Sequence, residues 1–490
     1  MSGKELPWTA PTPTRLDRRR SSASRRALGL VVLAVVALIL SNPTTSLELA
    51  HDSWTTLEAA LRPLPRDAHQ RALALMSRSP LIGPFRSASA HPDGHIDLPI
   101  LTRYLYANQL DNFDLDSPTK GQVDIPRLIK GKVGGFFWSV FVPCPEDAGF
   151  PSDNDGNFTT STWRVRDTLE QIDTARLLIS KYSDTFELVS TAKEWRRAMR
   201  RGKIAGMLGV EGGHQIGSSL SAIRTYFALG VRYITLTHTC NNALADSCGT
   251  QTTSISSRWD GLSPFGVEAV KESNRLGMII DLSHTAPKTA SDALSVSEAP
   301  VIFSHSNARG VHAAVRNVPD SILRRIGRIN HPNRSFNLTE DGEGGKGWGA
   351  DTGEAEKAVK AGDTIIMLNF SPDFVSQWPD KTGRRANVSL VADHADYIGK
   401  LAGRDKIGIG SDFDGILDVP EGLSDTSEYP NLITELIRRG WSDKEIKGVT
   451  GENMLRILEK VEQVAHRLRH VKPSTAIFEG RTDLVKHDHY

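Results

Sequence analysis

The sequence has few cysteines, almost no excess of charge and no very long hydrophobic run. Three cysteines among 490 residues are too few for a disulfide-dense scaffold or a four-cysteine zinc site, although one bridge can form. Lys and Arg total 59 against 58 Asp and Glu, so the net charge of +1 gives no electrostatic basis for binding nucleic acid. With 39% hydrophobic residues the chain can bury a large core, either in roughly two to four domains or in one large barrel.

The N-terminal region contains an uncharged apolar run, Ala27–Leu40, directly after an arginine-rich segment. The run is shorter than the roughly 20 residues that cross a bilayer core, which favours a cleaved signal peptide. The long basic flank and the lack of a clear cleavage site favour an uncleaved signal anchor, which we expect. Residues 1–26 would then be cytoplasmic, 27–40 the anchor, and 41–78 a linker and the start of the luminal or extracellular region, with secretion as the alternative. Four sequons would become glycosylation acceptors there: Asn157, Asn333, Asn337 and Asn387.

Short apolar runs alternate with segments of helical spacing such as 168–182, 220–229 and 391–401, which indicates a parallel α/β sheet. Eight runs are candidate strands: Gly94–Leu98, Gly135–Val142, Ile204–Val210, Tyr233–Thr237, Met278–Leu282, Val301–Phe303, Thr364–Leu368 and Ile407–Gly410. Eight strands close a (β/α)8 barrel, in which the chemistry lies at the C-terminal ends of the strands.

Histidines and carboxylates end six of these eight runs. In the first run the two-residue period of a strand places His95 and Asp97 on one side and Ile96 on the other. The other candidates are Glu211, His238, His284, His305, Asp412 and Asp414. One histidine at a strand end is more often structural than a ligand, but the joint pattern would surround one barrel mouth. Imidazole and carboxylate suit zinc, iron or manganese, and a bridging carboxylate suits two ions roughly 3.5 to 4 Å apart.

Seven motifs in order resemble the membrane (renal-type) dipeptidases, zinc enzymes of the amidohydrolase superfamily. They are DGHIDLP, GGFFWSVFVPC, GVEGGHQI continuing to LGVRYITLTHTCNNALADS, IDLSH, VIFSHSNAR, RNVPD, and GIGSDFDG with VPEGLSDTSEYPNLITELIRRGW. The resemblance spans about Ser79 to Gln463. It implies a (β/α)8 dipeptidase domain over 79–465, with insertions near 83–92 and 329–358 and a C-terminal extension at 466–490.

The resemblance assigns a role to each candidate. It implies two zinc ions per chain, one held by His95 and Asp97, the other by His284 and His305. Glu211 would bridge both ions. It further implies that His238 contacts the substrate carbonyl, that Arg316 of RNVPD clamps the substrate carboxylate, and that Asp412, in preference to Asp414, is the acid/base. A hydroxide held between two zinc ions is a nucleophile near neutral pH, because the metal lowers the pKa of its water to about 7.

The function expected is therefore zinc-dependent hydrolysis of dipeptides. The same barrel could instead act on N-acyl amino acids or lactams, but Arg316 favours a substrate with a free α-carboxylate. An inactive, receptor-like homologue is disfavoured because all five implied ligands are present. The partners expected are a dipeptide and, through the N-terminal segment, a membrane; a homodimer stays open.

Several residues depart from the family pattern or need separate interpretation. Cys144 and Cys240 occupy positions that are cysteine in the animal enzymes, so the resemblance implies a disulfide bond between them. Cys248 has no evident partner, and His312 stands where a second bridge would need cysteine. His214 is interpreted as structural rather than as a ligand. The 83–92 insertion is either a loop preceding the first strand or an artefact of gene prediction.

Overall fold

A computed structural model describes residues 64–77, 91–144, 163–250, 253–329, 360–376, 385–479 and 481. The chain divides into two compact units, and these residues all belong to the second, Leu64–Pro80 with Phe85–Tyr490. Several predicted features lie outside the described residues: segments 1–26 and 27–40, the sequons at Asn157, Asn333 and Asn337, and the insertions apart from His91, Pro92 and Ile329. The described part of the chain contains no helix that is both long and apolar enough to cross a membrane.

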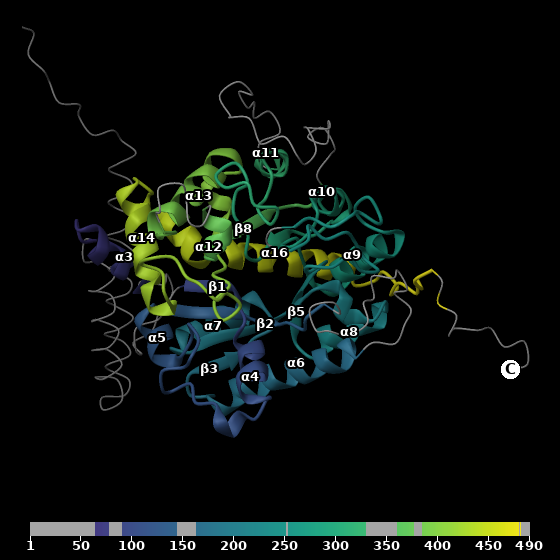
Figure 1. Cartoon of the computed structure of the whole chain (residues 1–490), viewed down its shortest axis with the longest axis horizontal. Coiled ribbons are helices and arrows are strands. Elements are labelled where there is room, and N and C mark those ends of the chain that lie inside the picture. The colour runs from purple at the N-terminus through teal and green to yellow at the C-terminus, as the bar shows by residue number, and fades with distance from the viewer. Residues whose placement is uncertain are drawn as a thin grey trace, which may run out of the picture. The chain divides into compact units, whose positions relative to one another are not determined.

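Eight parallel strands form the centre of the fold (Figure 1). They are β1 (His91–Ile96), β2 (Val133–Val140), β4 (Ile204–Glu211), β5 (Val231–Thr235), β6 (Ile279–Asp281), β7 (Val301–Phe303), β8 (Thr364–Leu368) and β9 (Ile407–Ile409). Each strand pairs with the next, and β9 returns to β1, where the Asp97 N–H donates to the Phe413 carbonyl at 2.9 Å. The predicted (β/α)8 barrel is confirmed. The short strand β3 (Phe186–Leu188), which was not predicted, pairs with β4 outside this order.

Helices connect the strands and pack around them. They are α3 (Ala68–Ser77), α4 (Leu98–Tyr106), α5 (Ile125–Lys130), α6 (Arg164–Lys181), α7 (Ala192–Arg200), α8 (Leu220–Ala228), α9 (Pro264–Leu276), α10 (Pro287–Val296), α11 (Asp320–Arg328), α12 (Pro372–Val375), α13 (Val388–Leu401), α14 (Tyr429–Arg438), α15 (Asp443–Lys447) and α16 (Asn453–Leu468). Short helical turns are η1 (Leu110–Asn112), η3 (Gly213–Ile216), η5 (Arg404–Lys406), η6 (Thr426–Glu428) and η7 (Gly448–Glu452). The three predicted helical segments fall on α6, α8 and α13.

The alternation of side chains along each strand separates two apolar layers. On β4, Leu208 and Val210 pack outward against the helices, whereas Met207 packs with Tyr233 inside the barrel. Glu211 follows the inward register of Met207. Gly209 makes room for this interior, because a Cβ there would overlap the Tyr233 ring.

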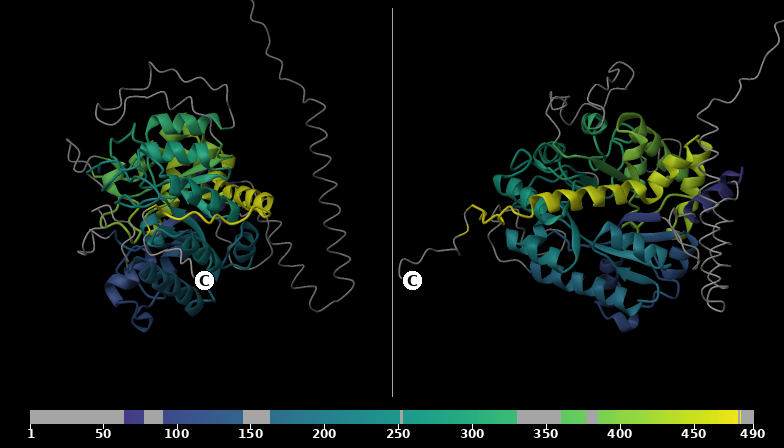
Figure 2. Two further views of the ribbon diagram at one scale, coloured as in Figure 1. Left: turned by 90° about the vertical axis from the view of Figure 1, so that its right-hand side faces the viewer. Right: turned by 180° about the vertical axis from the view of Figure 1, so that it is seen from behind.

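An ion cluster around the buried Asp363 lies at the N-terminal ends of β8 and β9. The Asp363 carboxylate, just before β8, pairs with Lys406 before β9 and with Arg456 (2.9 Å) and Lys460 (2.7 Å) of α16. Burial raises the pKa of Asp363, but the three cations outweigh burial and hold it below its usual range. The cluster fastens α16, the long yellow helix of Figure 2, to the barrel.

The packed structure extends beyond both expected limits of the dipeptidase domain. Before residue 79, α3 packs on α14, and Arg71 pairs with Asp443 at 2.7 Å. After residue 465, α16 continues to Leu468, and Phe478 is buried against Trp259 and Phe265. Helix α3 and Phe478, which lie outside residues 79–465, therefore pack against the barrel domain.

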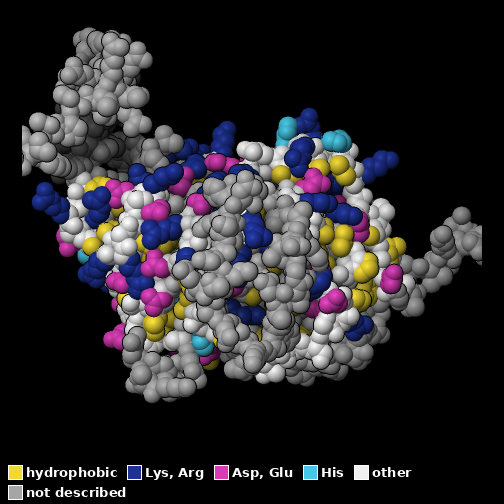
Figure 3. All heavy atoms as spheres, turned by 90° about the horizontal axis from the view of Figure 1, so that it is seen from above, with side chains coloured by type: hydrophobic (Ala, Val, Ile, Leu, Met, Phe, Trp, Pro, Cys, Tyr) yellow, Lys and Arg dark blue, Asp and Glu magenta, His cyan; other side chains and the backbone are white. Residues whose placement is uncertain are grey.

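The surface carries charges of both signs. On the face shown in Figure 3, basic and acidic side chains are interspersed over the described residues. This distribution matches the near balance of charges in the sequence.

Candidate metal centre and active site

The predicted site residues converge at the C-terminal ends of the strands. A cavity of about 630 Å³ opens there, and its lining includes Asp97, Glu211, His238, His284, Arg316 and Asp412. His95 and His305 lie beneath it, with no exposed surface. Residues from six different strand ends or following loops thus meet at one place, as the barrel geometry predicts.

Glu211 lies at the centre of this cluster. Its Oε2 is 3.4 Å from His95 Nε2, which is itself 3.3 Å from Asp97 Oδ2. Its Oε1 faces the other side, 3.0 Å from His284 Nε2 and 3.3 Å from His305 Nε2. One carboxylate therefore presents one oxygen to each of two groups of potential ligands.

The unpaired atoms of the cluster fit bound cations. Buried His95 Nε2 and Asp97 Oδ1 have no hydrogen-bond partner within the protein. His284 Nε2 and His305 Nε2 lie 3.0 Å apart. Two nitrogen lone pairs at this distance repel each other unless a proton or a cation lies between them. Ligand atoms of His95, Glu211 and His305 lie within 4.8 Å of one another. The same holds for Glu211, His238 and His284, and for His95, Asp97 and Asp412.

The charges of the cluster also favour cations. Burial lowers the pKa values of His238, His284 and His305, so these imidazoles are neutral and can act as ligands. Burial raises the pKa of Glu211, and the charge of nearby Asp97 raises it further. Burial alone would lower the pKa of His95, but Tyr233, Glu211 and Asp97 more than offset it and raise the value. A concentration of negative charge in a buried site is stabilised by positive charge, which metal ions supply.

Buried hydrogen bonds orient the imidazoles. His95 Nδ1 lies 2.7 Å from the Tyr233 hydroxyl, so its Nε2 points to Glu211. His305 Nδ1 lies 2.7 Å from Ser304 Oγ, which donates to Asp281 Oδ2 at 2.6 Å. Partners of this kind fix the tautomer and direction of metal-binding histidines.

Asp412 and Asp414 follow β9 and were the two candidates for the acid/base. Asp412 groups with His95 and Asp97, and its Oδ2 accepts a hydrogen bond from Asn369 Nδ2 at 2.8 Å. Asp414 Oδ1 instead accepts from the Gln122 backbone N–H at 2.6 Å. Burial raises the pKa of Asp412 to about 8, and Asp97 adds to the rise. Asp412 and Asp414 both have a positive φ of 68°, so the backbone conformation does not distinguish them.

His238 and Arg316 border the cavity above the carboxylate cluster. The His238 ring stacks on His284 with centroids 4.1 Å apart, and its Nε2 lies 3.7 Å from Glu211 Oε1. Arg316 is 5% exposed, donates to the His305 carbonyl at 3.3 Å, and lies over the Phe374 ring. Its Nε and Nη1 have no hydrogen-bond partner within the protein. A buried guanidinium with free donors is suited to an anionic group.

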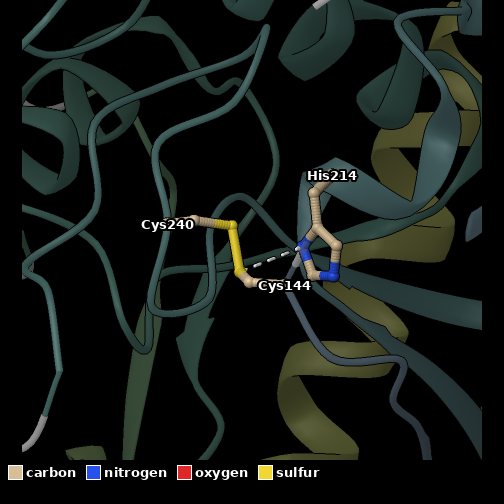
Figure 4. Close-up of side chains that lie close together, drawn as sticks. All are labelled: Cys144, His214 and Cys240. Atoms are coloured by element: carbon tan, nitrogen blue, oxygen red, sulfur yellow. Dashed lines mark hydrogen bonds between the residues drawn. A yellow bond between two sulfur atoms is a disulfide. The ribbon is translucent and has the colours of Figure 1, made fainter. Parts of the chain in front are cut away.

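The predicted disulfide between Cys144 and Cys240 is present beside this site (Figure 4). It joins the segments that follow β2 and β5. His214 Nε2 donates to the Val142 carbonyl at 2.7 Å, and its Nδ1 faces Cys144 Sγ at 4.0 Å. Burial lowers the pKa of His214 to about 4. Because both sulfurs are bonded to each other, they are not free thiolate ligands.

Four residues that support the site were not predicted from the sequence: Asp281, Ser304, Tyr233 and Asn369. Asp281 left a signal, because it is a buried acidic residue at the end of the otherwise apolar strand β6. The pairing of Tyr233 with His95 depends on residues 138 positions apart and leaves no local pattern.

A parallel barrel with imidazole and carboxylate groups at its mouth is an arrangement that suits a metal-dependent hydrolase. Residues 70–330 and 354–472 match the profile of the membrane dipeptidases, peptidase family M19. The chain belongs to this family, and it is a metallopeptidase of the dipeptidase type.

Solved structures share this fold. The probable dipeptidase PvdM from Pseudomonas aeruginosa is 21% identical with a TM-score of 0.62, over 82% of this chain and 100% of that one. A metallo peptidase from Rhodobacter sphaeroides, liganded with a phosphinate mimic of the dipeptide L-Ala-D-Ala, is 25% identical with a TM-score of 0.58. That alignment covers 76% of this chain and 99% of the other.

Proposed function

We propose that the chain hydrolyses dipeptides with two zinc ions, held by His95 and Asp97 on one side, His284 and His305 on the other, and Glu211 between them. The two-sided environment of Glu211 supports a bridging role. When bound, the ions supply Lewis acidity and lower the pKa of water, so that hydrolysis proceeds near neutral pH.

The remaining residues bind substrate and move a proton. Arg316 holds the terminal carboxylate, and His238 donates to the oxygen that gains charge as the scissile carbonyl is attacked. The oxygen of water joins the acyl carbon, the C–N bond breaks, and Asp412 passes the proton from that water to the departing amine. The products are two amino acids.

The observation that carries this proposal is the buried Arg316 guanidinium with two unpaired donor atoms beside the ligand cluster. A dipeptide offers a carboxylate at the required end, and so does an N-acyl amino acid. The similar protein bound to a dipeptide mimic favours the dipeptide. A substrate panel that contains both kinds of amide separates the two activities.

Arg316→Lys tests the substrate assignment. The lysine keeps the charge but loses the planar fork, so kcat/KM for dipeptides should fall by about 1 to 3 kcal/mol in transition-state terms. Zinc content should stay at two ions per chain by metal analysis. A dipeptide amide, which lacks the carboxylate, should be a poor substrate for the parent and lose little more in the variant. Arg467→Lys, on the surface of α16, is the matched control. Parental efficiency of Arg316→Lys on free dipeptides would contradict the clamp.

The membrane and glycan assignments are part of the same proposal. Residues 27–40 anchor the chain with the enzyme domain outside the cytoplasm, so carbonate-washed membranes should retain a protein with an intact N-terminus. A soluble, trimmed product would instead mean cleavage. Asn387 Oδ1 caps α13 by accepting from the Leu390 N–H at 3.1 Å. A glycan attaches to the amide nitrogen, so the cap and the glycan use different atoms.

A further inference from the structure

One side of the active-site cavity is lined by large apolar side chains, of which three are exposed and one, Ile416, is buried. Leu101, Tyr104 and Leu105 lie on one face of α4, three and four residues apart, and Ile416 and Leu417 follow β9. Tyr104 is 64% exposed, Leu105 44% and Leu417 100%. We call these five residues the apolar wall. They line the same cavity as His238 and Arg316, so the wall is continuous with the active site.

The backbone fixes the apolar wall next to the acidic side of the site. Asp97 directly precedes α4, and its N–H donates to the Phe413 carbonyl. Gly415 lies against the Asp97 carboxylate so closely that a Cβ there would overlap it. The helix α4 and the segment after β9 therefore approach each other beside Asp97 and Asp412.

Arg316 lies elsewhere around the mouth. It follows β7, three places from β1 around the barrel, and donates to the carbonyl of His305. A dipeptide whose carboxylate is at Arg316 and whose carbonyl is at His238 extends its other residue away from Arg316. The acidic side with its apolar wall is the part of the cavity that this residue reaches.

We propose that the apolar wall binds the side chain of the N-terminal residue of the substrate, and that the enzyme prefers dipeptides with a large apolar residue there. This inference rests on the proposed dipeptidase function. Burying a leucine or phenylalanine side chain against the wall gains apolar contact that glycine cannot make, which should raise kcat/KM at least about tenfold. An N-terminal aspartate is disfavoured because the wall adjoins Asp97, Asp412 and Asp414.

The test compares Gly-Gly, Leu-Gly, Phe-Gly and Asp-Gly as substrates of the zinc-loaded full-length chain. The parent should prefer Leu-Gly and Phe-Gly over Gly-Gly by at least about tenfold. Leu105→Ser with Leu417→Ser should reduce this ratio of kcat/KM values severalfold, because both substitutions remove apolar contact with the N-terminal side chain. Leu177→Ser is the matched control, because Leu177 on α6 is 48% exposed but does not line the cavity.

A second arm identifies which end of the substrate meets the wall. The ratio of kcat/KM for Gly-Leu to kcat/KM for Gly-Gly should not change in the double variant. The inference is overturned if the parent shows no preference at the N-terminal position, or if the double variant keeps the parental ratio. It is also overturned if the double variant changes only binding to phosphatidylcholine vesicles or self-association. If no dipeptide is hydrolysed at all, the proposed function itself has failed.

Discussion

The charge of Asp281 should control zinc binding through the direction of one hydrogen-bond chain. Asp281 is fully buried and accepts from Thr235 Oγ1 (2.6 Å), Ser304 Oγ (2.6 Å), and the N–H groups of Ser304 (2.8 Å) and Ser283 (3.1 Å). Because a carboxylate only accepts, the Ser304 hydroxyl donates to it and in turn accepts from His305 Nδ1. His305 Nε2 is then left with the lone pair that a metal ligand needs.

Asp281→Asn should reverse this chain. The amide nitrogen donates to the Ser304 hydroxyl, which then donates to His305 Nδ1 and leaves the proton on Nε2. Zinc binding must displace that proton, so we expect zinc affinity to fall by about 10- to 100-fold. The fall corresponds to about 1.4 to 2.7 kcal/mol. The free energy of unfolding should drop by about 1 to 3 kcal/mol, because the charged acceptor is lost but the hydroxyls can turn.

Competition with a chromophoric chelator measures the zinc affinity of the variant, and urea denaturation measures its stability. Ser304→Ala should lose zinc affinity similarly, since it removes the link to His305. Asp292→Asn is the control, because Asp292 pairs with Lys288 on the surface of α10. If Asp281→Asn is folded and binds zinc as tightly as the parent, the proton-direction argument is refuted.

Two further predictions concern stability. Replacing both Cys144 and Cys240 by serine opens a link between residues 96 positions apart, so the free energy of unfolding in urea should fall by about 2 to 5 kcal/mol; a loss well below 1 kcal/mol would contradict this reading. Burial lowers the pKa of His394 to about 4, so the unfolded chain binds a proton more readily between its ordinary pKa near 6.5 and pH 4. The contribution of His394 to the free energy of unfolding is complete above about pH 6.5. It falls as the pH decreases, by about 2 kcal/mol between pH 7 and 5. His394→Gln should remove that part of the pH dependence in urea titrations, and an unchanged slope would show that His394 does not titrate in this way.

The sequence predicts most of the barrel strands well because they are apolar runs whose inward and outward residues are both buried. β7 and β8 fall on their predicted limits, and the other strands shift by a few residues. The strand ends also predict which residues meet, since parallel strands bring their C-terminal ends to one rim. The chemical roles of those residues came from the family resemblance rather than from spacing.

Other features were beyond reach because they depend on partners distant in sequence. β3 is only three residues long and acquires its structure from pairing with β4. Phe478 is a similar case. Its sequence neighbours predict a polar tail, and its burial depends on contact with Trp259 and Phe265. Local pattern cannot reveal such contacts.

The seating of Phe478 and α3 limits how far the enzyme can be trimmed for crystallisation. A fragment of residues 79–465 would remove α3, the last turn of α16 and Phe478 together. It would uncover the apolar faces of α14 and α9 that these segments protect, and uncovered faces of this kind promote aggregation. A fragment that begins at Leu64 and ends at Arg481 keeps both α3 and Phe478 in place. It is therefore the better starting point for a soluble preparation.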